Sequence, residues 1–167
     1  MTNETPVFPE IDPRTFWGAI GCRAAGVAIV TVEGSEGPAG FLALSATHLT
    51  ASPPTVTVSL DKKTSAGPEL VAKKAFAINY LAMEGRDIFH RFTMRDGPKG
   101  ADRFEGLTLS RLATGAPILP YITGVLDCRL EEVIERHGTY LIIGQIIAFE
   151  NFKDRHPLVH YQGQVLA

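Results

Sequence analysis

A run of short hydroxyl side chains stands in the first half of the chain, together with one histidine and two adjacent lysines. Residues 43–66 read ALSATHLTASPPTVTVSLDKKTSA, with nine serines and threonines, His48, and the pair Lys62 and Lys63. Hydroxyls, cations and backbone N–H groups are the partners that a phosphate or another polar ligand requires. The stretch therefore indicates either a pocket for a polar ligand or an ordinary β-rich segment that favours threonine and valine.

The end of this stretch has the features of a phosphate site. Lys62, Lys63, Thr64 and Ser65 come directly before a predicted helix. The free N–H groups and the dipole of a helix N-terminus bind phosphate, and two adjacent lysines add positive charge. The alternative is a solvated turn followed by a normal serine or threonine cap.

The beginning of the stretch is predicted to be a loop. Residues 45–50 follow a predicted strand and precede Pro53 and Pro54, which give the chain an extended, stiff exit. Such a loop can hold backbone N–H and C=O groups against the edge of a flat heteroaromatic ring. A polar connection between two strands is the alternative. One strand joins the loop to the lysines, so the two can share one pocket.

Other motifs with known chemistry are absent from the sequence. It contains no GxGxxG, GxxxxGK[ST] or GxSxG pattern. The two cysteines, Cys22 and Cys128, form no CxxC motif, and His156 and His160 have no partner ligands nearby, so no metal site is predicted. We expect the cysteines to be buried thiols in a reducing compartment.

The composition of the 167 residues fits one domain. Apolar residues make up 45% of the chain, and 16 basic against 18 acidic residues give a formal net charge of −2, which offers no electrostatic basis for nucleic-acid binding. The sequence has no window of 18 uncharged apolar residues for a membrane span, and its start lacks the features of a secretory signal. We expect a cytoplasmic protein with a polar arm at residues 1–12 and one domain at 13–167.

The elements that must position this stretch are mostly strands. Asp12 and Pro13 predict the start of a helix that ends at Gly26, with Phe16, Ile20 and Arg23 on one stripe. Strands are predicted at residues 27–33, 39–45, 55–60, 76–82, 106–112, 124–138 and 139–150, and further helices at 65–75 and 85–95. Many strands and only two or three short helices indicate a mainly β fold, an antiparallel barrel with helices around it.

The two long strands differ in their patterns. Residues 124–138 alternate, with Asp127, Arg129 and Glu131 on a face that is predicted to be wet. Residues 139–150 are apolar nearly throughout, so we expect both faces of this strand to be covered. Gly144 in its middle predicts a bulge or the close approach of another segment.

The order of these segments resembles the flavin reductase-like family, which has the FMN-binding split-barrel fold. The resemblance rests on the hydroxyl-rich loop, PP, a strand, DKKTS, a helix and FAIN, and it continues with FTMRDG…DRFEG, TGAPIL, the long hairpin and PLVHYQG. It runs from about Phe16 to Gly163. It implies a six-stranded antiparallel Greek-key barrel and a homodimer that holds FMN or FAD near the dimer interface, with NADH or NADPH as the reductant.

The resemblance also implies site residues. The flavin-ring loop falls on Phe41, Leu42, Ala43, Leu44, Ser45, Thr47 and His48. The phosphate end falls on Lys62, Lys63, Thr64 and Ser65. Arg103 and Phe104 fall on the family's DRF element, near the mouth of the active site.

The sequence departs from the family pattern at three places. Members often have Thr where this chain has Leu42, and Ser where it has His48. Many carry a histidine just before the last long strand, whereas here His137 is displaced by about two residues and Thr139 or Tyr140 occupies that position. His48 and His137 are the candidates for a catalytic role, although the flavin itself carries hydride chemistry and such a histidine is more often an ordinary surface or hydrogen-bonded residue.

The function implied by the resemblance is that of a NAD(P)H-dependent flavin reductase that supplies reduced flavin to a partner monooxygenase. The loop also resembles a corrinoid-reducing subgroup that acts on cob(II)yrinic acid a,c-diamide in cobalamin biosynthesis. From another class, the same barrel can serve as a flavin- or haem-binding module without turnover, with His48, His137 or His160 as a haem ligand. An interaction protein without a ligand is a further alternative.

Overall fold

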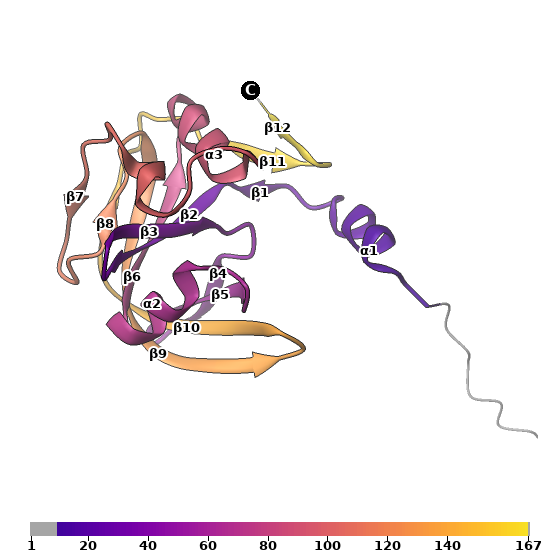
Figure 1. The fold of residues 1–167 in the computed structure, drawn as a ribbon, viewed down its shortest axis with the longest axis horizontal. Coiled ribbons are helices and arrows are strands. Elements are labelled where there is room, and N and C mark those ends of the chain that lie inside the picture. The colour runs from indigo at the N-terminus through magenta and orange to yellow at the C-terminus, as the bar shows by residue number, and fades with distance from the viewer. Residues whose placement is uncertain (1–9, 167) are drawn as a thin grey trace, which may run out of the picture.

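A computed structural model describes residues 10–166 as a mainly β fold with short helices around it (Figure 1). The helices are α1 (Pro13–Ile20), α2 (Ala66–Lys73) and α3 (Arg86–Thr93), and the 3-10 helices are η1 (Met83–Gly85) and η2 (Gly100–Phe104). The strands are β1 (Ala25–Gly26), β2 (Ala28–Gly34), β3 (Gly37–Leu42), β4 (Thr47–Ala51), β5 (Pro54–Asp61), β6 (Ala75–Leu81), β7 (Ser110–Arg111), β8 (Pro117–Ile118), β9 (Ile122–Arg136), β10 (Thr139–Asn151), β11 (Val159–Tyr161) and β12 (Gln164–Leu166). The predicted fold class is confirmed.

Seven strands form one antiparallel sheet in the order β3-β2-β6-β9-β10-β5-β4. β3 and β4 are the two edges of this sheet, yet only residues 43–46 connect them. Five chain steps span at most about 18 Å, so the sheet must curl until its edges lie near each other. The two edge strands are not hydrogen-bonded neighbours, so the barrel stays split there. The predicted split barrel is confirmed, with seven strands in place of six.

Two clusters of buried apolar side chains cover the two faces of the central strands. Val30 and Ile78 belong to one cluster, which also contains Leu70 of α2. Ile29 belongs to the other cluster, which also contains Ile88 of α3. Side chains alternate between the faces of a strand, so β2 and β6 are covered on both sides and read as continuous apolar runs.

Two buried polar side chains fasten residues 114–119 to the sheet. The fully buried Asp127 of β9 accepts hydrogen bonds from the Thr114 N–H at 2.8 Å and from the Thr114 hydroxyl. The side-chain carbonyl of Asn79 accepts a hydrogen bond from the Leu119 N–H at 2.9 Å. Because unpaired buried polar groups are costly, these bonds hold the segment in one position.

The first helix is shorter than the prediction. It ends at Ile20, whereas the sequence predicted Gly26, because Ala25 and Gly26 pair with β11 in a separate three-stranded sheet. The start of the helix is as predicted, since the carboxylate of Asp12 accepts hydrogen bonds from the first turn. Of the edge strand predicted at residues 106–112, only β7 is a strand.

The loop predicted at residues 45–50 is also wrong in part. Residues 47–51 form the edge strand β4, which pairs with β5 in a hairpin. The turn of this hairpin contains a cis peptide bond between Ser52 and Pro53. Because β4 and β5 pair antiparallel, the chain reverses at the prolines, where the sequence predicted an extended exit, and only residues 43–46 remain a connection.

The predicted exposure of the two long strands is corrected at several positions. Asp127 lies on the face that was predicted to be wet, but it is fully buried. On β10 the predicted cover is missing at the end of the strand, where Ile147 is 45% and Phe149 is 63% exposed. The prediction for Gly144 is confirmed, because the β9–β10 register shifts beside it and Phe76 packs against it.

Candidate functional site

Part of the predicted ring loop lines a pocket of about 510 Å³ beside the split in the barrel. Four segments supply the lining: α1 with the residues that follow it, the β3–β4 connection, the end of β5 and the start of β10. The lining residues are Phe16, Trp17, Ile20, Arg23, Leu42, Ala43, Leu44, Ser45, Ser59, Leu60, Asp61 and Thr139. We name this the Leu44 pocket; it brings together four of the seven residues predicted for the ring loop.

Hydrogen bonds hold the β3–β4 connection in place along this pocket. The Ser45 hydroxyl accepts a hydrogen bond from the Ser59 N–H at 3.0 Å and donates one to the Ser59 carbonyl at 3.2 Å. The Arg23 guanidinium donates to the Leu44 carbonyl at 2.9 Å. Ser45 therefore bridges the connection to β5, and this wall of the pocket is fixed before a ligand arrives.

The predicted phosphate end is a tight turn directly after β5. The Thr64 N–H donates to the Asp61 carbonyl at 2.9 Å, and the Lys63 N–H donates to the Asp61 carboxylate at 2.8 Å. The Lys62 N–H donates to the Gly138 carbonyl at 3.0 Å, which joins the turn to the β9–β10 hairpin. Because Asp61 lines the Leu44 pocket, the turn begins at the edge of that pocket.

The two lysines of the turn differ in their surroundings. The Nζ of Lys62 lies 2.5 Å from a carboxylate oxygen of Glu135 and 5.2 Å from the centre of the Tyr140 ring. The hydrogen bond to Glu135 raises the pKa of Lys62. Lys63 forms no salt bridge with any residue between 10 and 166. Lys63 is therefore the lysine whose charge is available to an anionic ligand.

Ser65 lies on a different hollow from the ring loop. It is the N-cap residue of α2, but its side chain makes no capping hydrogen bond. It lines a hollow of about 420 Å³, together with Glu36, Glu69, Lys99 and Asp102. The structure therefore does not bring Ser65 into the Leu44 pocket, and three carboxylates surround the hollow that it does line.

The two candidate catalytic histidines lie outside the Leu44 pocket and apart from each other. His48 is on β4 and, with Thr47, lines a hollow of about 620 Å³, which we name the β4 hollow. His137 is exposed at the turn of the β9–β10 hairpin, with a φ of 46°. The carbonyl of the next residue, Gly138, accepts a hydrogen bond from the Lys62 N–H. His137 lies two residues before Thr139, which lines the Leu44 pocket.

Phe41, Arg103 and Phe104 do not present their side chains to the Leu44 pocket. Phe41 is 7% and Phe104 is 4% exposed, and the Phe104 ring packs edge-on against Phe92 with 5.5 Å between the ring centres. The Arg103 guanidinium donates to the Gly40 carbonyl at 3.3 Å. These three predicted residues therefore support β3, where the sequence had predicted contact with a ligand.

Several residues of the pocket were not predicted as site residues. Trp17, Asp61 and Thr139 lie on three elements that meet only in the folded chain. The stripe of Phe16, Ile20 and Arg23 was the one signal in the sequence, and it was used only to predict a helix. The fold instead turns this stripe toward the pocket.

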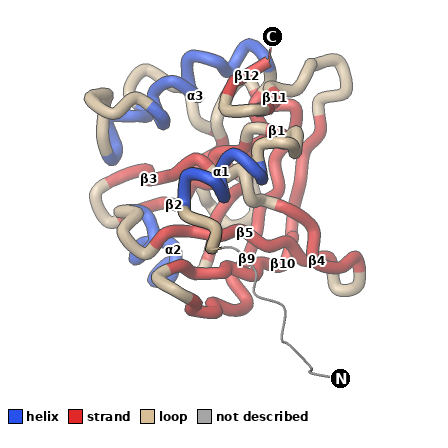
Figure 2. The backbone as a smooth tube through the Cα atoms, turned by 90° about the vertical axis from the view of Figure 1, so that its right-hand side faces the viewer, coloured by secondary structure: helices blue, strands red, loops and turns tan. Residues whose placement is uncertain are grey.

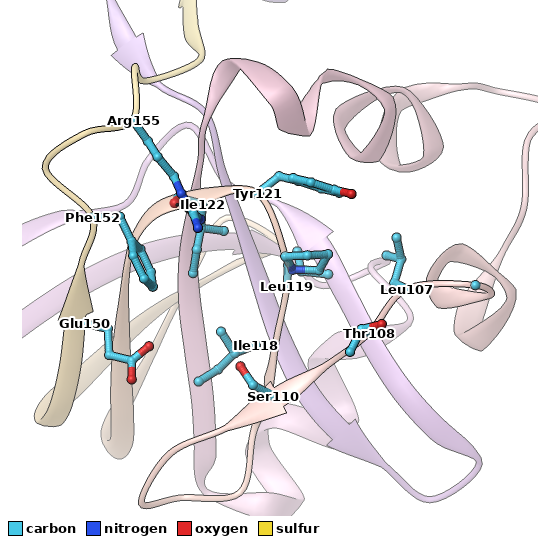
Figure 3. Close-up of a pocket in the computed structure, with 12 residues that line it drawn as sticks. Leu107, Thr108, Ser110, Ile118, Leu119, Tyr121, Ile122, Glu150, Phe152 and Arg155 are labelled. Carbon is cyan, nitrogen blue, oxygen red and sulfur yellow. Dashed lines mark hydrogen bonds between the residues drawn. The ribbon is translucent and has the colours of Figure 1, made fainter.

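A separate hollow of about 390 Å³ lies between β8, β9 and the end of β10 (Figure 3). Arg155 donates to the Ile122 carbonyl at 2.9 Å, and its guanidinium lies 4.2 Å from the centre of the Phe152 ring. None of the predicted site residues lines this hollow. Arg155 is already held by the backbone and the ring, so its contacts serve the packing of residues 152–155.

Two classes of site receive no support from residues 10–166. No group of three or more histidine, cysteine, aspartate or glutamate side chains in this range is arranged to hold a metal ion. No helix in the same range is long and apolar enough to cross a membrane.

Comparison with known proteins gives a consistent result. Residues 20–167 match the family model described as the flavin reductase like domain. The chain is 31% identical to FMN reductase (NADH) RutF 2 of Rhizobium rhizogenes, over 96% of this chain and 93% of the relative. It is 27% identical to the flavin-dependent monooxygenase reductase subunit HsaB of Mycobacterium tuberculosis, over 92% and 81%.

The fold agrees with that match. The crystal structure of the NADH:FAD oxidoreductase SgcE6 of Streptomyces globisporus superposes with a TM-score of 0.85 at 26% identity, covering 96% of this chain and 98% of that one. The family model covers nearly the whole chain, and the fold is a split barrel whose β3–β4 connection lines a pocket. Both findings support the same family assignment. The chain belongs to the flavin reductase-like family.

Proposed function

We propose that this protein is a flavin reductase that transfers a hydride from NADH or NADPH to FMN or FAD held in the Leu44 pocket. The observation that carries the proposal is the pocket itself. Four residues implied for the ring loop line it, and the turn with Lys63 begins at its edge. The relative RutF 2 is named as an FMN reductase that uses NADH, which supports the same donor for this chain.

The pocket fits a flavin nucleotide in size and in chemistry. Ligand pockets commonly measure about 300–1,000 Å³ and combine apolar walls with a few polar groups. The Leu44 pocket measures about 510 Å³, and Leu42 and Leu44 stand beside Ser45 and Thr139. The charge of Lys63, one turn before α2, suits a phosphate.

The roles of the chain's own residues are binding and orientation. A bound flavin supplies the hydride acceptor. Ser45 and Arg23 hold the β3–β4 connection in place through hydrogen bonds. A flavin ring whose edge lies along this connection is therefore held in one orientation. Holding the two reactants in a fixed orientation accelerates hydride transfer between them. Hydride transfer from a nicotinamide requires no acid or base from the protein, so neither Arg23 nor Asp61 is assigned a proton-transfer role.

We further propose that the reduced flavin is passed to a partner oxygenase. Ser59 and Asp61 are exposed, so a ligand reaches the Leu44 pocket from solvent. HsaB of Mycobacterium tuberculosis is named as the reductase subunit of a flavin-dependent monooxygenase, which supports a similar role here.

The proposal is tested by mixing the purified protein with FMN or FAD, removing free flavin by dialysis, and adding NADH or NADPH without oxygen. We expect retained flavin whose visible absorption disappears when the nicotinamide is added. Retained flavin that neither nicotinamide bleaches would indicate a binding module, and a Soret band in the protein as purified would indicate haem. With cob(II)yrinic acid a,c-diamide in the mixture, a Co(I) spectrum would identify a corrinoid acceptor. A protein that retains no flavin and does not bleach added flavin with either nicotinamide contradicts the proposal.

The phosphate assignment is tested separately with single substitutions. We expect Lys63→Ala to raise the dissociation constant for FMN about ten- to a hundredfold, the effect of losing one charge-assisted hydrogen bond. Ser65→Ala should leave the dissociation constant nearly unchanged, because Ser65 lines a separate hollow. Lys62→Ala should have a smaller effect, because Glu135 already holds that lysine. Lys153→Ala, in the connection after β10, is the control for loss of one positive charge. Equal dissociation constants for all four variants would refute the assignment.

A further inference from the structure

The helix α1 presents an uncovered apolar surface beside the Leu44 pocket. None of residues 13–20 is buried, and the exposed fractions of Phe16, Trp17 and Ile20 are 47%, 68% and 38%. The helix stands beside the barrel (Figure 1), and the view from that side shows it in front of the strands (Figure 2). Large apolar side chains clustered on one face of a helix normally indicate that something covers them.

The helix nevertheless has a defined position, because its C-terminal end is held on two sides. The carbonyl of Gly21 accepts a hydrogen bond from the Gln162 N–H at 3.2 Å. Two residues further on, the Arg23 guanidinium donates to the Leu44 carbonyl at 2.9 Å. These contacts hold α1 beside the β3–β4 connection, and residues of both segments line the same pocket.

The two walls offer different chemistry to a ligand. The connection presents backbone groups and the Ser45 hydroxyl, which suit the polar edge of a ring. The wall formed by α1 presents Phe16 and Trp17, whose rings are 5.2 Å apart at their centres and inclined by 71°, and these suit the face of a ring. Arg23 adds a positive charge to the same pocket, so a flat heteroaromatic ring with an anionic tail matches both walls.

We propose that α1 is the outer wall of the flavin site and that Trp17 stacks on the face of the bound flavin ring. This inference rests on the proposed function and adds to it a ligand-binding helix outside the predicted ring loop. Stacking of one aromatic side chain on a base-like ring changes affinity by about five- to a hundredfold. The ring is thus held at its edge by the connection and on its face by α1.

The emission of bound FMN, excited in its visible band, tests the contact. Trp17 is the single tryptophan of the chain, so no other indole can quench a flavin by electron transfer at contact distance. We expect bound FMN to be nearly dark in the wild-type protein and several-fold brighter in Trp17→Leu. Trp17→Leu should also raise the dissociation constant about five- to a hundredfold. Trp17→Phe should keep nearly wild-type affinity and still brighten the flavin.

Met94→Ala is the matched control, since Met94 is 58% exposed and lines none of the four hollows described above. Its affinity and emission should equal those of the wild type. FMN that binds wild type and Trp17→Leu with equal affinity and equal emission overturns the inference and leaves the proposed function intact. A change of oligomeric state in Trp17→Leu with unchanged emission also overturns it, because a second copy of the chain then covers α1. Failure of the wild type to bind FMN removes both proposals.

Discussion

At the scale of single residues, the hydroxyl-rich stretch serves structure and site together. The Ser45 hydroxyl bonds to both backbone groups of Ser59, and the Thr50 hydroxyl accepts a hydrogen bond from the Ser52 N–H at 3.3 Å. Thr55 is buried in β5. These hydroxyls stabilise a twisted edge of the sheet, which is the structural alternative stated from sequence. Ser45 and Ser59 also line the Leu44 pocket, so the two interpretations of the stretch do not exclude each other.

The two cysteines give a prediction at the same scale. Cys128 is fully buried, and burial, followed by the charge of Asp127, raises the pKa of its thiol from 9.0 to about 12. Cys22 is exposed. We expect a thiol reagent near neutral pH to modify one cysteine in the native protein and two in denaturant. Two reactive thiols in the native protein would contradict the burial of Cys128.

The raised pKa of Cys128 also has a consequence for stability at high pH. The folded state keeps the thiol proton to a higher pH than the unfolded state does, so the contribution is complete below pH 9.0 and is lost as pH rises toward about 12. The free energy of unfolding should therefore fall more steeply over this range in the wild type than in Cys128→Ala. Denaturant unfolding at several pH values measures the difference, and parallel curves would count against it.

At the scale of elements, β10 and β6 are in close contact inside the barrel, where Gly144 meets Phe76. A Cβ on Gly144 would overlap Cζ of Phe76 and lie 2.8 Å from its Cε1 atom. Phe76 is fully buried, so its ring has little room to move. The glycine in the middle of an apolar strand is thus required by the Phe76 ring that packs against it, and the β9–β10 register shifts at the same position.

We expect Gly144→Ala to lower the free energy of unfolding by about 1–3 kcal/mol, the usual cost of overpacking a core. Urea unfolding followed by far-UV circular dichroism measures it. Gly18→Ala is the control, because a Cβ there meets no atom within 4 Å and alanine favours the helix that contains it. A loss of stability at Gly18 equal to that at Gly144 would mean that contact with Phe76 is not the cause.

At the scale of the whole molecule, the chain leaves apolar surface uncovered at the end of β10. Ile147 and Phe149 are 45% and 63% exposed. The neighbouring residue Ile146 lines the β4 hollow, whose lining also includes Leu126. In that hollow the hydroxyl of Thr55 has no hydrogen-bond partner among residues 10–166. A second chain placed here would cover the apolar side chains and explain why β10 reads as apolar throughout.

We therefore expect a homodimer formed through this surface. Sedimentation velocity should give twice the mass of one chain, and Phe149→Glu should shift the protein toward the monomer by placing a charge in the interface. Met94→Glu, at an exposed site in the loop after α3, should leave the dimer unchanged. A wild-type monomer at micromolar concentration would refute the interface.

The sequence by itself determined the class of the fold and most of its elements. Period-two runs, turn residues and the Asp12 cap are local signals, because each favours a backbone conformation in the segment where it occurs. The four predicted pocket residues came from the resemblance to the flavin reductase-like family, whose ring loop falls on the β3–β4 connection. The local signals failed at Gly26 and at Asp127, where pairing or burial depends on a partner in another segment. They also failed at β4, where the chain reverses at the two prolines and pairs with the next strand.

Only the tertiary structure decided which side chains share the pocket. It turned the Phe16 stripe toward the pocket, put Asp61 and Thr139 beside Leu44, and placed Ser65 and His48 on other hollows. The physical reason is the curl of the sheet. Because only residues 43–46 join the two edges of the sheet, the sheet must curl and bring distant segments together. No local pattern in the sequence of either segment predicts which distant segment it will contact.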